Sequence, residues 1–289
     1  MRVSQFVNQY TLLRRQESAK HLENVQRASR RFIEANGDIA IYEVSEEHIA
    51  RFLSEISRSC ESSHTVKHYL TLIKAVINEA FQEGLVRRLP RFPRVRVERR
   101  LPDAWTVEEL QRLFDYVGRL DGYVGVIPAS LWWSSLLMTA YYTGLRLSAL
   151  LSISWFQVDL TGHFLRALTK KTKKEQVFAI PQELANTLEK MQVPPREKVW
   201  EHPYNSKWPC KALRRIVDAA GIPAPKHLHG QLFQKMRRTC ITWTAVHDVS
   251  MATRVAGHAS PETTIKHYVD PRMLGAIKPV VPRIDLKVS

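Results

Sequence analysis

The sequence predicts a mainly α-helical protein with one small antiparallel β-sheet, in which a helical N-terminal domain precedes an α+β C-terminal domain. Three observations support this fold class. Apolar residues recur at helical spacing through most of the chain, short apolar runs that suit strands occur within 153–181, and a segment rich in arginine and proline separates the two helical parts. The 289 residues also suffice for two domains of ordinary size.

Residues 1–86 form the first predicted domain, and apolar side chains at helical spacing indicate helices throughout it. The clearest helix covers 65–81, where apolar residues follow the i, i+3, i+4, i+7 pattern of one buried face. Lys67 and Lys74 fall on the opposite side, so we expect both to be exposed. Gly84 is a typical residue to end this helix.

Residues 87–103 differ in composition from both neighbours and are predicted to link the two domains. Seven arginines stand against two acidic residues, and three prolines exclude a continuous helix and favour an extended chain. A purely solvated linker is one interpretation. So many guanidinium groups repel one another unless anions lie between them, and we therefore expect contacts with phosphate groups, above all from Arg91, Arg94 and Arg96.

Residues 104–289 form the second predicted domain. Thr106 and Glu109 have the spacing of a capping box at a helix start, and the apolar stretch 130–151 is predicted to be a buried helix. Residues 153–181 change to short apolar runs around a lysine-rich turn, which indicates a small antiparallel sheet. Further helices are expected from residue 182 onward and in segments 211–220, 233–247 and 260–268.

The charge balance narrows the partners of the chain. Lys and Arg total 43 against 28 Asp and Glu, a formal net charge of +15, and this excess favours nucleic acid as a polyanionic partner over a merely basic surface. No apolar run reaches the roughly 18 residues of a membrane span, and the N-terminus lacks the apolar core of a signal peptide. We therefore expect no membrane partner and a cytoplasmic, nucleoid-associated protein.

The three cysteines, Cys60, Cys210 and Cys240, lie far apart in the sequence. Their spacing excludes a disulfide framework and any CxxC zinc site, and it suits a reducing compartment. We expect neither a metal ion nor a cofactor.

Five features of the second domain carry side chains suited to catalysis. Taken alone, each has a plain structural explanation: a solvated lysine turn, an arginine pair with one ion pair, a locally hydrogen-bonded histidine, or a tyrosine in the core or on the surface. An arginine just past a glycine in apolar surroundings, however, must be paired or face a cleft. The features are Arg146 in the run TGLRLS, the lysines of 170–174, Arg237 with Arg238, His258 after Gly257, and Tyr268.

The order and spacing of these features change their weight. The run TGLRLS, a lysine hairpin, the run RRT, the pair GH and the run TTxxxY follow one another as in the tyrosine recombinases, or phage-type integrases, and the chain resembles this family over its whole length. The resemblance implies a core-binding domain at the N-terminus and a catalytic domain over 104–289. It also implies a tyrosine nucleophile that attacks a DNA phosphodiester, forms a 3′-phosphotyrosyl bond and releases a 5′-hydroxyl.

Residues that match the family's motifs acquire roles through this resemblance. Arg146 and Arg237 would stabilise the negative charge of the pentavalent phosphorane, because guanidinium groups bind phosphate bidentately and keep their proton. His258 would hydrogen-bond the scissile phosphate or assist the tyrosine's proton. Tyr268, ten residues after the histidine, would be the nucleophile. No metal ion is implied, because the arginines stabilise the charge.

A lysine of the hairpin matches the family's general acid, which protonates the leaving 5′-oxygen. Lys171 fits best because the run KTKKE matches the usual KTxKE-like pattern, and Lys173 is the alternative. The other DNA contacts that we expect come from basic residues of both domains and the linker. They are Lys67, Lys74, Arg91, Arg94, Arg96, Lys173 and Arg238.

Two positions depart from the family pattern. Gln234 stands where the family usually has histidine, three residues before the second arginine, and Ala149 stands where it usually has an acid. Glutamine can donate a hydrogen bond to phosphate but cannot carry a proton. The related type IB topoisomerases place lysine there, so histidine is not compulsory. His227 and His229 are either loop histidines or substitute phosphate contacts.

The resemblance as a whole implies a site-specific recombinase acting on double-stranded DNA, the integrase of a mobile element. Strand exchange needs two DNA sites with two protomers on each, so a homotetramer is expected, and the apolar tail after Tyr268 would dock on a neighbouring protomer or pack on its own domain. The chain starts directly with the core-binding helices, so recognition of distant arm sites is not expected. The alternatives are a type IB-like topoisomerase and a DNA-binding regulator or relic that has lost activity.

Overall fold

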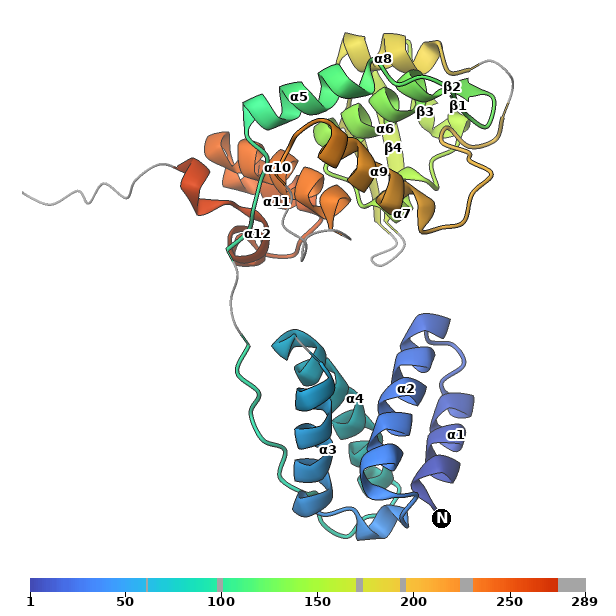
Figure 1. Ribbon diagram of the computed structural model, residues 1–289, viewed down its shortest axis with the longest axis vertical. Coiled ribbons are helices and arrows are strands. Elements are labelled where there is room, and N and C mark those ends of the chain that lie inside the picture. Colours follow the sequence, from blue (N-terminus) through green and yellow to red (C-terminus); the bar gives the residue numbers. More distant parts are fainter. Residues whose placement is uncertain (61, 98–100, 170–173, 193–195, 224–230, 275–289) are drawn as a thin grey trace, which may run out of the picture. The chain divides into compact units, whose positions relative to one another are not determined.

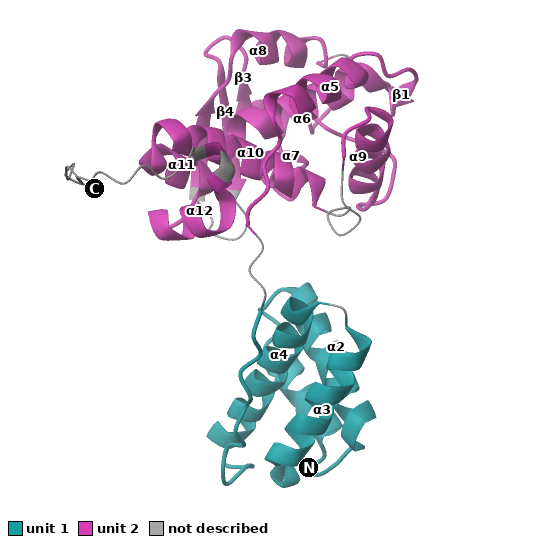
Figure 2. Ribbon diagram, turned by 60° about the vertical axis from the view of Figure 1, so that its left-hand side comes forward, with its two compact units in different colours: residues 1–100 teal, residues 101–289 magenta. Residues whose placement is uncertain are grey.

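The computed structural model describes residues 1–60, 62–97, 101–169, 174–192, 196–223 and 231–274. The chain divides into two compact units, residues 1–100 and residues 101–289, each with its own hydrophobic core (Figure 2). Helices dominate both units, and the described strands form two small antiparallel sheets in the second, which confirms the predicted fold class. No helix in these ranges combines the length and apolarity needed to cross a membrane.

Unit 1 is a helical bundle whose apolar stripes meet in one core. The rings of Phe32 and Phe52 contact edge to face at its centre, with centroids 5.5 Å apart. The helix predicted over 65–81 is confirmed, and Lys67 and Lys74 lie exposed on it. The elements are α1 (Val3–Leu13), α2 (Ala19–Asn36), the 3-10 helix η1 (Ile41–Glu43), α3 (Glu46–Ser59) and α4 (Ser63–Gln82).

Unit 2 surrounds two central helices, α6 and α10, with shorter helices and a sheet (Figure 1). α10 packs against α6 and α11, which come just before Arg146 and His258 in the chain, and against α12, which carries Tyr268. The helices are α5 (Val107–Val117), α6 (Ala129–Thr143), α7 (Leu147–Leu150), η2 (Trp155–Gln157), α8 (Gln182–Glu189), α9 (Trp208–Ala219), α10 (Leu232–His247), α11 (Val249–Ala256), α12 (Pro261–Tyr268) and η4 (Pro271–Leu274). The strands are β1 (Tyr123–Val124), β2 (Ile127–Pro128), β3 (Val158–Asp159), β4 (Phe164–Thr169) and β5 (Lys174–Ala179).

The prediction of one continuous helix over 130–151 is wrong, because the chain turns between α6 and α7. Gly144 has a φ of +60°, a left-handed conformation that favours glycine. A Cβ atom added there would lie 3.2 Å from the Sγ atom of Cys240 and 3.2 Å from a methyl group of Val255, so the side chains of α10 and α11 would have to shift to admit it. The turn carries Arg146 out of the apolar helix to the start of α7.

The predicted sheet within 153–181 is confirmed as an antiparallel sheet of order β3-β4-β5, with Phe164 opposite Ala179. Its lysine-rich turn, residues 170–173, lies outside the described residues. β1 and β2 form a second small hairpin that the sequence pattern does not predict, because strands of two residues are too short to show a period of two.

α11 is a short helix that the sequence analysis does not predict. It begins where α10 ends, and the carboxylate of Asp248 accepts the backbone N–H groups of Ser250 at 2.7 Å and Met251 at 3.1 Å. Gly257 ends it with a φ of +62°. The turn at this glycine leads the chain directly into His258, whose backbone N–H remains bonded to α11.

Candidate active site

Arg237 is the most deeply buried of the candidate site residues that the structure describes, with only 2% of its surface exposed. From α10 its guanidinium donates to the carbonyl oxygen of Gly144 at 2.5 Å and to that of Ala256 at 2.7 Å. Burial and the charge of Arg146 lower its pKa. Its Nε atom is buried without a hydrogen-bond partner in the described part of the chain. Arg237 therefore joins the ends of α6 and α11.

Arg146 brings a second positive charge to the same place from an exposed position. It precedes α7, where its carbonyl oxygen accepts the backbone N–H of Ala149 at 2.8 Å. Its charge contributes to lowering the pKa of Arg237, of His258 and of Tyr268, so it lies near all three. Ala149 is buried and has no carboxylate with which to orient this guanidinium.

Tyr268 is the last residue of α12, and its ring faces the guanidinium of Arg237, whose central carbon lies 5.2 Å from the ring centroid. Burial alone would raise the pKa of this tyrosine. The charges of Arg237 and Arg146 outweigh burial, and hydrogen bonds with Gln234 and Arg237 add to their effect, so the net result is a lowered pKa. The hydroxyl group of Tyr268 therefore loses its proton more easily than an ordinary tyrosine would.

His258 lies beside Tyr268, with ring centroids 4.6 Å apart. Its Nδ1 atom is 3.0 Å from the hydroxyl oxygen of Thr264, a fully buried residue of α12 that fixes the orientation of the imidazole. Burial lowers the pKa of His258, and the positive charges of Arg237 and Arg146 lower it further. The imidazole is therefore neutral at pH 7, and Nε2 remains for another partner.

Gln234 lies on α10 close to Tyr268 and belongs to the same site. It is half-buried on α10, three residues before Arg237, and it hydrogen-bonds with Tyr268. The structure thus brings Gln234, Arg237, Arg146, His258 and Tyr268 together, as the sequence motifs lead one to expect. The two alternative phosphate contacts at positions 227 and 229 lie outside the described residues.

Lys171 and Lys173, the two candidates for the general acid, also lie outside the described residues. The strand that follows them, β5, is hydrogen-bonded to α11, and the sequence pattern did not indicate this contact. The side-chain nitrogen of Gln176 on β5 donates to the carbonyl oxygen of Arg254 in α11 at 2.7 Å. The hairpin that carries the lysines is therefore bonded to the helix that precedes His258.

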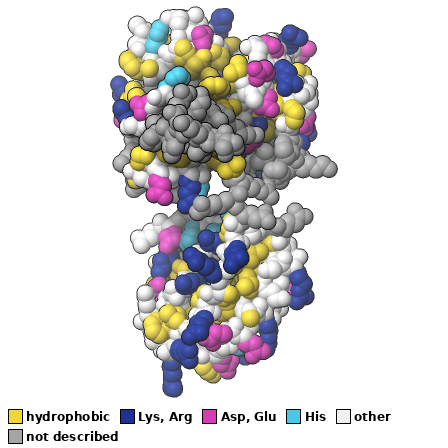
Figure 3. Space-filling model, turned by 90° about the vertical axis from the view of Figure 1, so that its left-hand side faces the viewer, with side chains coloured by type: hydrophobic (Ala, Val, Ile, Leu, Met, Phe, Trp, Pro, Cys, Tyr) yellow, Lys and Arg dark blue, Asp and Glu magenta, His cyan; other side chains and the backbone are white. Residues whose placement is uncertain are grey.

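The remaining basic candidates fall into two groups. Lys and Arg side chains gather on one face of unit 1 (Figure 3). All of the basic candidates that belong to unit 1 are exposed: Lys67, Lys74, Arg91, Arg94 and Arg96. Lys74 also lies 5.7 Å from the ring centroid of Phe92, which brings the linker beside α4. Arg238 differs, because it is half-buried in unit 2 and burial lowers its pKa against the opposing charges of Asp103 and Asp270.

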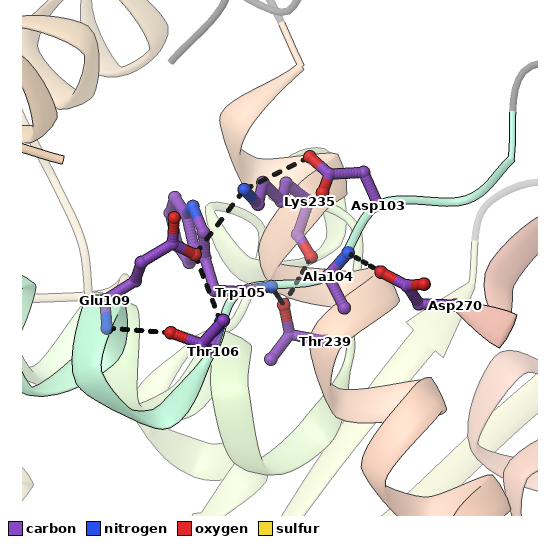
Figure 4. Close-up of polar contacts among 8 residues, drawn as sticks. All are labelled: Asp103, Ala104, Trp105, Thr106, Glu109, Lys235, Thr239 and Asp270. Atoms are coloured by element: carbon purple, nitrogen blue, oxygen red, sulfur yellow. Dashed lines mark hydrogen bonds and ion pairs between the residues drawn. The ribbon is translucent and has the colours of Figure 1, made fainter. Parts of the chain in front are cut away.

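Sequence reasoning missed a polar network behind the site (Figure 4). Lys235, 5% exposed, lies with its Nζ atom 3.1 Å from a carboxylate oxygen of Asp103 and 3.7 Å from one of Glu109. Thr239 accepts the backbone N–H of Trp105 at 2.9 Å. The capping box of Glu109 predicted a helix start there, but nothing in the local pattern indicated that α10 supplies the partners. Among the described residues, no group of His, Cys, Asp and Glu is arranged to hold a metal ion.

Comparisons with known proteins agree with this geometry. The family model described as the Phage integrase family matches residues 105–274. The chain is similar to lambda integrase, solved as a dimer bound to a COC′ core site, with a TM-score of 0.75 and 16% identity over 98% of this chain and 80% of that chain. It is also similar to the Tn1549 transposon integrase, solved with transposon right end DNA, with a TM-score of 0.77 and 12% identity over 93% of this chain and 95% of that chain. No curated protein sequence matches the chain.

The structural similarities, at these low identities, establish the fold. The family match spans more than half of the chain and includes the elements that bear Arg146, Arg237, His258 and Tyr268. The chain therefore belongs to the phage integrase family, that of the tyrosine recombinases.

Proposed function

We propose that this protein cleaves and rejoins DNA strands with Tyr268 as the nucleophile. The setting of its hydroxyl group supports this most directly, because Arg237 and Arg146 lower the pKa of a tyrosine that burial alone would raise. A nucleophile that loses its proton more easily is more reactive. Attack of the phenolic oxygen on phosphorus would form a 3′-phosphotyrosyl bond and release a 5′-hydroxyl. Attack by a 5′-hydroxyl would then reseal a strand without ATP.

The other site residues would supply charge and proton transfer. Arg237 and Arg146 place two positive charges beside the tyrosine, where the non-bridging oxygens of a scissile phosphate would lie. His258, which is neutral at pH 7, is suited to accept the tyrosine's proton or to donate to the phosphate. For the general acid that protonates the leaving 5′-oxygen we propose Lys171, with Lys173 as the alternative, on the strength of the family resemblance.

Double-stranded DNA is the proposed partner of both units. The exposed cations of unit 1 and of the arginine-rich linker would contact phosphates and supply affinity, and Arg238 in unit 2 would add to them. The similar lambda integrase structures contain DNA, and one is a tetramer bound to a Holliday junction. We propose a homotetramer on two DNA sites in the same way, and a mobile element as the source of the activity.

A covalent trap tests the nucleophile. The full-length protein is incubated with duplexes from the DNA that flanks its coding sequence, each nicked near the cleavage position so that a short 5′-hydroxyl fragment diffuses away and the adduct persists. We expect a denaturant-resistant protein–DNA adduct whose modified peptide contains Tyr268. Tyr268→Phe removes one hydroxyl group and no charge, so adduct should disappear while DNA affinity stays within about twofold.

Tyr142→Phe is the matched control. Tyr142 lies on α6 in the same unit, its hydroxyl donates to Glu183, and burial together with this carboxylate raises its pKa to about 12. This variant should form adduct at the parental rate. An adduct that persisted in Tyr268→Phe, or that mapped to another residue, would refute the assignment. DNA binding without any adduct in the parent would instead indicate a DNA-binding regulator that has lost activity.

A further inference from the structure

Two segments that are far apart in the sequence lie side by side on one face of α10. Thr239 accepts the backbone N–H of Trp105 at 2.9 Å. One turn later, the hydroxyl of Thr242 donates to the carbonyl oxygen of Tyr268 at 3.0 Å and accepts the backbone N–H of Asp270 at 3.0 Å. Helix positions three apart share a face, so the two threonines hold both segments on the same side of α10.

The side chain of Asp270 closes the network (Figure 4). Asp270 is fully buried, and its carboxylate accepts the backbone N–H of Ala104 at 3.1 Å. Burying a carboxylate is costly unless hydrogen bonds compensate for the lost water. Asp270 follows the tyrosine by two residues, and Ala104 immediately follows the arginine-rich linker. This buried contact connects the end of the linker to the segment that carries the tyrosine.

We infer that Thr242 and Asp270 are positioning residues, which hold the backbone of Tyr268 against α10 so that its hydroxyl group meets Arg237, and which tie that placement to the end of the linker at Ala104. The inference rests on the proposed function of Tyr268 as the nucleophile. Neither Thr242 nor Asp270 is expected to touch DNA or the reacting atoms, since both are fully buried.

The need for such positioning follows from where the tyrosine stands. Tyr268 is the last residue of its helix, and the chain continues in extended conformation at Val269. A helix end frays unless side chains satisfy its backbone groups. Thr242 satisfies the carbonyl of Tyr268 and the N–H of Asp270 with one hydroxyl. Reactions between held groups are sensitive to placement, and a displacement of about 1 Å can cost roughly 10²-fold in rate.

Substitutions of Thr242 separate positioning from folding. Thr242→Val keeps the shape and removes the hydroxyl, and Thr242→Ser keeps the hydroxyl. Thr244→Val is the matched control, because Thr244 lies on the same helix and its hydroxyl donates to the carbonyl of Cys240 within that helix. At saturating nicked DNA, Thr242→Val should form adduct about 10- to 100-fold more slowly. Thr242→Ser and Thr244→Val should remain within about threefold of the parent, and all four proteins should bind DNA with equal affinity.

A second measurement needs no DNA. Tyr268 carries a lowered pKa because it lies near Arg237 and Arg146. In a ¹³C-tyrosine NMR titration of the free protein, Thr242→Val should raise the pKa of Tyr268 toward its ordinary value, and Thr244→Val should leave it unchanged. If Thr242→Val does not fold, Asp270→Ala, which removes the contact with Ala104, takes its place in both measurements with the same expected direction.

The outcomes are distinct. Parental adduct formation and an unshifted tyrosine titration in a folded Thr242→Val or Asp270→Ala protein would overturn the positioning role. So would equal losses in Thr242→Val and Thr244→Val, which would indicate a general effect on α10. A parent that forms no adduct would instead refute the proposed function. The titration would still decide whether Thr242 places the tyrosine beside the arginines.

Discussion

Lys235 and Arg237 are two buried cations on the same turn of α10, and they have different partners. Carboxylates compensate the charge of Lys235. Its Nζ atom lies 3.1 Å from a carboxylate oxygen of Asp103, 3.7 Å from one of Glu109 and 5.6 Å from the ring centroid of Trp105. Arg237 is bonded to two backbone carbonyls, and no ion pair with a carboxylate is found for it in the described part of the chain.

The difference is that the charge of Lys235 is compensated by carboxylates within the protein, whereas that of Arg237 is not, among the residues that the structure describes. A buried charge costs several kcal/mol unless partners compensate for the lost water. Asp103 and Glu109 compensate Lys235. Arg237 has instead a second cation, Arg146, nearby, and burial together with this repulsion lowers its pKa. A phosphate group would supply the missing negative charge. The face of α10 that bears Arg237 would therefore serve catalysis, and the face that bears Lys235 would serve stability.

Among the substitutions that test this difference between Lys235 and Arg237, Arg237→Lys is expected to have the largest effect. Lysine keeps the charge but cannot bond two carbonyls and a phosphate through a planar fork. Adduct formation in single-turnover assays should fall by about 10²-fold or more, the usual loss for one charge-stabilising donor. Arg215→Lys, at an exposed position of α9, should match the parent. A parental rate in Arg237→Lys would show that the guanidinium group of Arg237 is not needed for the reaction.

Lys235→Met should act on stability. It removes the ion pairs of the Nζ atom with Asp103 and Glu109, and removing one partner of a buried ion pair costs roughly 3–5 kcal/mol. Because Asp103 is 28% exposed, we expect about 2–4 kcal/mol in the free energy of unfolding, measured by denaturant titration. Lys211→Met on the exposed side of α9 should change it by less than about 0.5 kcal/mol. An unchanged denaturation midpoint for Lys235→Met would contradict its structural role.

Substitutions of Gln234 should have a smaller effect on catalysis than Arg237→Lys. Gln234→Ala removes a neutral donor near Tyr268 and should slow adduct formation by about 10- to 100-fold without abolishing it, because Arg146, Arg237 and His258 remain. Gln234→His should keep or raise the rate, with a larger gain below about pH 6.5, where imidazole becomes charged. The measurement is single-turnover cleavage across pH for all three proteins. Identical rates at every pH would make Gln234 a structural residue.

The smallest expected effect is a shift in the titration of His258. In the free protein, burial and the charges of Arg237 and Arg146 hold the pKa of His258 below its ordinary value of 6.5. A bound phosphate would offset the positive charge around the imidazole, so DNA should raise this pKa. NMR titration of Tyr268→Phe, free and with uncleaved DNA, measures the change. A pKa that stayed constant or fell on binding would indicate that the phosphate does not reach His258.

Local pattern in the sequence determined much of this protein. Apolar spacing predicted the helix over 65–81 and the sheet within 153–181, because both depend on contacts between near neighbours in the chain. The order of the motifs singled out Arg146, Arg237, His258 and Tyr268, which the structure places together. Taken alone each of these residues has a plain structural explanation, and it was their order and spacing, through the resemblance to the tyrosine recombinases, that singled them out.

Tertiary structure decided what depends on distant partners. The apolar stretch 130–151 looks like one helix, but the chain leaves the helix at Gly144 in a left-handed conformation, where side chains of α10 and α11 pack closely against the glycine. The carbonyls that bind Arg237 stand 93 and 19 residues away from it, and the buried carboxylate of Asp270 meets Ala104 across 166 residues. A repeating pattern records which side of an element faces the core, but it does not record which distant backbone group the folded chain brings there.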